Sequence, residues 1–96
     1  MKIELEVGQE LMIPLKSNPT TGYRWELAKP LDEDILELVE KEYKEPETDL
    51  VGADGEEAWT FRAIHKGGTA VALEYVRPWE KNGPPTETQT LTVVVH

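Results

Sequence analysis

The sequence predicts an all-β protein, an immunoglobulin-like antiparallel β-sandwich of seven to eight strands with no disulfide. Short stretches in which apolar and polar residues alternate occur along all 96 residues, which is typical of strands with one face in a core. Glycine and proline residues that favour turns separate these stretches. The chain has no cysteine, so its apolar core alone has to offset the entropy lost on folding. We expect a single domain over residues 1–96.

The first part of the chain carries the clearest alternation. Lys2–Val7, Leu11–Leu15 and Tyr23–Leu27 each place apolar residues at every second position, which predicts three strands. Pro14 lacks the N–H group that a central strand uses, and this places the second strand at a sheet edge or at a break. Trp25 occupies the position of the core tryptophan on the third strand of an immunoglobulin-like sandwich.

The segment Ile35–Tyr43 fits both a helix and a strand. Residues 35, 38, 39 and 42 can share one face of a helix, and residues 37, 39, 41 and 43 form the alternate row of a strand. Glutamate and leucine also favour a helix. Periodicity does not separate the two interpretations. We choose the strand because every other element is β, and a single helix would need its own packing surface.

The second half of the chain completes the set of strands. Three alternating stretches are Trp59–Ala63, Val71–Tyr75 and Leu91–Val95. The Lys66-Gly67-Gly68 sequence predicts a turn before the middle one. Residues 44–57 and 77–87 contain glycines and prolines outside any alternation, and we interpret them as long loops.

Charge and hydropathy argue against a nucleic-acid partner and against a membrane-spanning segment. Nineteen acidic and ten basic residues give a formal net charge of −9, which argues against binding to a nucleic-acid backbone. No stretch has the length and hydropathy of a membrane span. Charged Lys2, Glu4 and Glu6 stand where the apolar part of a signal peptide would lie. We therefore expect a soluble monomer, either cytoplasmic or the mature part of an exported protein.

The residues offer little for an enzyme. Ser17 is the only serine, and His65 and His96 are the only histidines, so a triad for acyl transfer would depend on an improbable pairing of Ser17 with His65. The acidic stretches Asp32–Asp34 and Asp49–Glu57 lack the ligand spacing of an EF-hand loop. We expect no catalytic residue, no metal and no cofactor.

Three connections have an unusual content for loops. The first contains Asn18, Pro19, Thr20, Thr21, Gly22 and Tyr23; the second contains Leu50, Val51, Gly52, Ala53, Asp54 and Gly55; the third contains Arg77, Pro78 and Trp79. They follow the second, fourth and sixth expected strands, and such connections can gather at one end of an immunoglobulin-like sandwich. Tryptophan and arginine are typical anchors of protein interfaces. We expect a binding edge made of three loops.

The same loops resemble those of a known family. Asn18-Pro19-Thr20-Thr21-Gly22, Gly52-Ala53-Asp54-Gly55 and Arg77-Pro78-Trp79, in this order and spacing, closely resemble the chagasin family of cysteine protease inhibitors. The resemblance extends over nearly the whole chain and includes Trp25 and the Glu74-Tyr75 run before the third loop. The second motif departs from the family, because Asp54 replaces a glycine of its Gly-X-Gly-Gly pattern.

The resemblance implies an immunoglobulin-like domain that reversibly blocks papain-like cysteine proteases. Thr20 and Thr21 would enter the cleft beside the catalytic cysteine and histidine, and Gly22 would permit the close approach. Leu50–Gly55 would lie along the non-primed side of the cleft. Arg77 and Trp79 would lie along the primed side, with Trp79 stacked on an aromatic side chain of the enzyme.

A second function is compatible with the same fold. An immunoglobulin-like accessory module for carbohydrate or peptide would use Trp79 and Tyr23 as its binding surface. The two hypotheses differ at the first loop. An inhibitor depends on Thr21 and Gly22, whereas an accessory module depends on Trp79.

Overall fold

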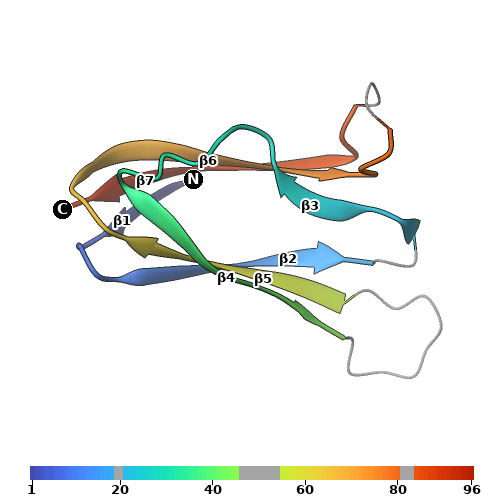
Figure 1. Ribbon diagram of the computed structural model, residues 1–96, viewed down its shortest axis with the longest axis horizontal. Helices are drawn as coiled ribbons and strands as arrows, with labels where there is room; N and C mark the ends of the chain where they lie inside the picture. The colour runs from blue at the N-terminus through green and yellow to red at the C-terminus, as the bar shows by residue number, and fades with distance from the viewer. Residues whose placement is uncertain (19–20, 46–54, 81–83) are drawn as a thin grey trace.

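The computed structural model describes residues 1–18, 21–45, 55–80 and 84–96 (Figure 1). Within these ranges the chain forms seven strands and no α-helix, and no helix in the described residues is long and apolar enough to cross a membrane. The strands are β1 (Lys2–Leu5), β2 (Glu10–Ser17), β3 (Arg24–Leu27), β4 (Leu36–Lys44), β5 (Gly55–Ala63), β6 (Gly67–Val76) and β7 (Glu87–Val95).

The strands form two sheets that pack face to face as a sandwich (Figure 1). One sheet has the order β1-β7-β6-β3, and the other has the order β2-β5-β4. The predicted sandwich is confirmed, with one parallel pair that the sequence did not indicate. β1 runs parallel to β7, with Lys2 opposite Thr92. After β1 the chain crosses to the other sheet, so β1 and β2 do not form a hairpin and β1 pairs with the last strand.

The core lies between the inner faces of the two sheets. Trp25 on β3 is 4% exposed, which confirms its expected place. The other large buried side chains come from both sheets: Leu5, Ile13, Leu15, Leu36, Trp59, Phe61, Val71, Leu73, Leu91, Val93 and Val95. Each buried side chain of this size stabilises the fold by about 1.5–3 kcal/mol relative to exposure.

Residues 36–44 form a strand, as chosen. β4 is the edge of its sheet and pairs only with β5. The pairing register shifts between Leu38 and Glu40, so an extra residue interrupts the period of two. Apart from Leu36, every side chain of β4 is exposed. The bulge and this exposure explain why hydrophobic periodicity could not separate strand from helix.

The strand bounds differ from the prediction at three places. β1 ends at Leu5, and Val7 is 49% exposed, because the chain turns between Glu6 and Gln9. β5 begins at Gly55, four residues before Trp59, and β6 already includes the two glycines expected in a turn. Pro14 does lie on an edge strand, because β2 pairs only with β5.

Candidate functional site

The strands that flank the three selected loops end on one side of the sandwich (Figure 1). β2 ends and β3 begins there, as do the pairs β4 and β5, and β6 and β7. Ser17, at the end of β2, pairs with Gly55, at the start of β5. The ends of the strands that carry the three connections therefore lie at one end of the sandwich, as expected.

The structure describes part of each loop. Pro19 and Thr20 of the first loop, and the second-loop residues Leu50, Val51, Gly52, Ala53 and Asp54, lie outside the described residues. Asn18 and Thr21–Tyr23 are described in the first loop, Gly55 in the second and Arg77–Trp79 in the third.

The first loop is closed by hydrogen bonds between its own residues. The carbonyl oxygen of Asn18 accepts from the amide of Thr21 at 3.1 Å and from its hydroxyl at 2.7 Å. The amide of Tyr23 donates to Thr21 Oγ1 at 3.4 Å. Gly22 has a φ of +84°, a conformation that costs a side-chain-bearing residue about 1–2 kcal/mol. Thr21 is thus presented, exposed, at a fixed turn.

The third loop braces the first. Arg77 Nε donates to the carbonyl oxygen of Thr21 at 3.3 Å, and the guanidinium carbon lies 4.6 Å from the centre of the Tyr23 ring. The same guanidinium pairs with Glu80 at 3.4 Å. Arg77 therefore connects two loops that are 56 residues apart in the sequence.

Trp79 covers the glycine of the first loop. Its side chain is 66% exposed, yet a Cβ added to Gly22 would collide with the six-membered ring of its indole. The indole thus lies directly against the backbone of Gly22. An exposed tryptophan held in this way is typical of an interface anchor.

Tyr75, near the end of β6, contacts the first loop through its hydroxyl group and its ring. Its hydroxyl oxygen accepts from the Asn18 amide at 2.9 Å. Its ring lies 5.3 Å from the ring of Tyr23 and 5.2 Å from that of Trp25. The sequence indicated Tyr75 as a strand residue and as part of the family resemblance before the third loop. Its contact with the first loop depends on the pairing of β3 with β6.

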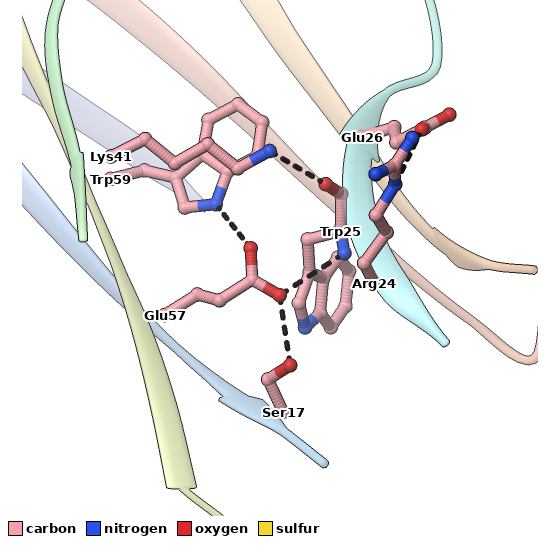
Figure 2. Close-up of polar contacts among 7 residues, drawn as sticks. All are labelled: Ser17, Arg24, Trp25, Glu26, Lys41, Glu57 and Trp59. Carbon is pink, nitrogen blue, oxygen red and sulfur yellow. Dashed lines mark hydrogen bonds and ion pairs between the residues drawn. The ribbon is translucent and has the colours of Figure 1, made fainter. Parts of the chain in front are cut away.

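Glu57 is the main residue that sequence reasoning missed (Figure 2). It was interpreted as part of an exposed loop, but it lies on β5 and is 6% exposed. Its Oε2 accepts from Ser17 Oγ at 2.8 Å and from the amide of Trp25 at 3.2 Å, and its Oε1 accepts from Trp59 Nε1 at 3.2 Å. These donors belong to β2, β3 and β5.

Gly55 corrects the predicted extent of the second loop. It is the first residue of β5 and is buried. A Cβ at Gly55 would collide with the hydroxyl of Tyr43 and come close to the carbonyl oxygen of Lys44. Gly55 therefore packs against the neighbouring strand β4 as the first residue of β5.

The residues weighed for catalysis are held apart. Ser17 is buried and donates to Glu57, whereas His65 lies in the turn between β5 and β6, at the opposite end of the sandwich. Nor does any group of three or more histidines and acids in the described parts of the chain come close enough to hold a metal ion.

Comparison with known proteins identifies the family. The profile described as "Chagasin family peptidase inhibitor I42" matches residues 4–93. The chain belongs to the chagasin family of cysteine protease inhibitors. Membership of the chagasin family makes the protein an inhibitor and not an enzyme, and it does not favour the accessory-module hypothesis.

Relatives within the chagasin family match along most of their length. Chagasin from Trypanosoma cruzi is 35% identical over 94 residues, which are 95% of this chain and 84% of that protein. Amoebiasin-2 from Entamoeba histolytica is 31% identical over 93 residues, covering 97% of this chain and 76% of that protein. The crystal structure of the cysteine protease inhibitor EhICP2 from Entamoeba histolytica superposes with a TM-score of 0.88 at 28% identity, covering 99% of this chain and 86% of that one.

Proposed function

We propose that this protein reversibly inhibits papain-like cysteine proteases by placing the three loops in and along the active-site cleft. The observation that carries the proposal is the arrangement of the first and third loops. Thr21 is exposed at a turn in which its hydroxyl donates to the Asn18 carbonyl oxygen and Arg77 donates to the Thr21 carbonyl oxygen. Trp79 lies beside this turn with two thirds of its side chain exposed.

Each loop has its own part in the proposal. The first loop enters the cleft with Thr20 and Thr21 beside the catalytic cysteine and histidine, and Gly22 provides the positive φ of the turn and the room for the indole of Trp79. Leu50–Asp54 lie along the non-primed side, with Gly55 as their anchor on β5. On the primed side, Arg77 braces the first loop and Trp79 stacks on an aromatic side chain of the protease.

Rigidity explains how such an edge inhibits a protease without being cleaved. The first loop is tied at the Asn18 amide to Tyr75 and at the Thr21 carbonyl to Arg77. A loop that is ordered before binding loses little conformational entropy in the complex, so more of the contact energy appears as affinity. The same ties oppose the extended backbone path that a protease substrate adopts.

The proposal is tested by titrating papain with the purified protein and a fluorogenic peptide substrate. We expect saturable, reversible inhibition by the wild type. Thr21→Trp should raise the inhibition constant by about 30-fold or more, the effect of losing an interface hot spot. Thr92→Trp is the matched control, because Thr92 is also exposed but lies on β7 toward the opposite end. It should inhibit as the wild type does.

Two results would contradict the proposal. Equal inhibition by the wild type and Thr21→Trp would show that the first loop does not enter the cleft. Absence of inhibition of papain and of a cathepsin-like relative at micromolar protein would exclude these enzymes as targets, and quenching of Trp79 fluorescence by carbohydrates or peptides would then be measured.

A further inference from the structure

We propose that Glu57 is a positioning residue of the inhibitor, whose buried carboxylate fixes the ends of the first loop relative to the start of β5, where the second loop ends. This inference rests on the proposed function of the loops. It assigns to Glu57 no contact with the protease. Its effect on binding is exerted through the strands that carry the loops.

The carboxylate joins both ends of the first loop. Ser17, which donates to Oε2 at 2.8 Å, is the last residue of β2 and directly precedes the loop. Trp25, whose amide donates to the same oxygen at 3.2 Å, is the second residue of β3. Glu57 itself lies two residues after Gly55. One oxygen atom therefore links three strand ends that border two loops.

Glu57 also links the two sheets at the loop end. β2 and β5 belong to one sheet, and β3 belongs to the other. Two further hydrogen bonds bring Trp25 to the sheet of Glu57: Trp25 Nε1 donates to the Lys16 carbonyl at 2.9 Å, and Lys41 Nζ donates to the Trp25 carbonyl at 3.3 Å. Figure 2 shows the Lys41 bond together with the bonds to Glu57. Trp25 is thus held by β2, β5 and β4.

Burying the carboxylate of Glu57 between the sheets costs desolvation free energy. A charged group removed from water has to be compensated by hydrogen bonds, and an apolar side chain of similar size often gives equal or greater stability. Both oxygens of Glu57 are occupied by donors. No buried side-chain nitrogen or oxygen in the described part of the chain lacks a partner. The carboxylate therefore fixes the relative positions of Ser17, Trp25 and Trp59, because only a side chain with two acceptor oxygens can bind all three donors.

The expected consequence is a loss of pre-organisation when Glu57 is changed. Without the shared acceptor, Ser17 and Trp25 no longer fix the separation of β2 and β3 at the loop end. The first loop then samples more arrangements relative to the second, and binding has to order it. The inhibition constant rises although every residue in contact with the protease is still present.

Glu57→Gln is the sharpest variant, because it preserves size and shape. The hydroxyl of Ser17 can turn and accept a hydrogen bond, but the backbone amide of Trp25 and the indole N–H of Trp59 can only donate. Whichever way the glutamine is oriented, its NH₂ group faces one of these two donors. Ser17→Ala is the second variant, since it removes only the bond that precedes the first loop.

Val93→Ala is the matched control for stability. Val93 is fully buried on β7 and pairs with Ile3, toward the end away from the loops. Its truncation lowers the melting temperature without touching the loop end. Any effect that Glu57→Gln shares with Val93→Ala is a stability effect, and only the remainder reports positioning.

The first readout needs no protease. ¹⁵N relaxation of the free proteins gives order parameters for the amides of Thr21 and Gly22, and relaxation dispersion reports slower exchange. We expect order parameters of about 0.85, typical of a rigid backbone, in the wild type and Val93→Ala. Lower values or new exchange should occur in Glu57→Gln and Ser17→Ala. Unchanged relaxation at these amides in Glu57→Gln would overturn the inference.

The second readout is the inhibition constant for papain, measured well below the melting temperature of every variant. Glu57→Gln should raise it by about tenfold, the cost of ordering a few residues on binding, and Val93→Ala should leave it within about twofold. If Thr21→Trp abolishes inhibition but Glu57→Gln has no effect, the inference is wrong and the proposed function stands. If the wild type does not inhibit, the proposed function is wrong, and the relaxation data alone decide whether Glu57 positions the loops.

Discussion

At the scale of single residues, Gly22 combines a positive φ with a close contact to the indole of Trp79. We expect Gly22→Ala to weaken inhibition strongly, because the added methyl group would displace the indole of Trp79 in addition to straining the backbone at a φ of +84°. The strain alone should lower the free energy of unfolding by about 1–2 kcal/mol. Urea unfolding and the inhibition constant for papain measure the two effects.

Gly8→Ala is the control that separates backbone strain from displacement of the Trp79 indole. Gly8 has a φ of +95°, and a Cβ there would meet no atom within 4 Å. The two alanine variants should therefore lose similar stability, while only Gly22→Ala loses inhibition. Equal inhibition by both variants would show that the packing of Trp79 on Gly22 does not matter for binding.

Sequence reasoning at the residue scale succeeded where the signal was local. Trp25 was placed in the core from the alternation around it. Glu57 was missed because its sequence neighbours Glu56 and Gly55 are those of an exposed loop, and its donors Ser17 and Trp25 lie 40 and 32 residues away. A buried acid is recognisable only when the partners that compensate its charge are known.

At the scale of elements, β4 is an open edge protected by charge. It spans nine residues with one paired side, and such an edge can pair with another chain unless charged side chains discourage it. We expect Glu42→Val to cause concentration-dependent self-association, seen by sedimentation velocity as a growing dimer fraction. Glu74→Val is the control, because β6 is paired on both sides. A monomeric Glu42→Val at high concentration would show that this charge does not protect the edge.

The elements were largely predictable, and the exceptions have physical causes. Alternation located six of the seven strands, because these have one face in the core, and β4 was chosen as a strand because every other element is β. Alternation could not show that β1 pairs in parallel with β7, since pairing depends on where the chain crosses between sheets. The early start of β5 was hidden because Gly55 is typical of a turn, although its lack of a side chain is what lets it pack on Tyr43.

At the scale of the whole molecule, the dominant feature is the excess of acidic over basic residues. The net charge of −9 creates a field that acts before any loop touches a protease. It should slow association with an acidic protease and speed association with a basic one. Dissociation depends mainly on contacts in the complex and should change little.

Salt tests this effect because it screens the field. Raising the ionic strength from 0.01 M to 0.1 M shortens the Debye length from about 30 Å to about 10 Å, so we expect the association rate with an acidic papain-like protease to rise in stopped-flow measurements. Changing Glu33 and Asp34 to lysine shifts the net charge by two units each, from −9 to −5, at the end away from the loops. This variant should associate faster at low salt with the same dissociation rate. An association rate that is unchanged or falls on adding salt would show that long-range repulsion does not control the encounter.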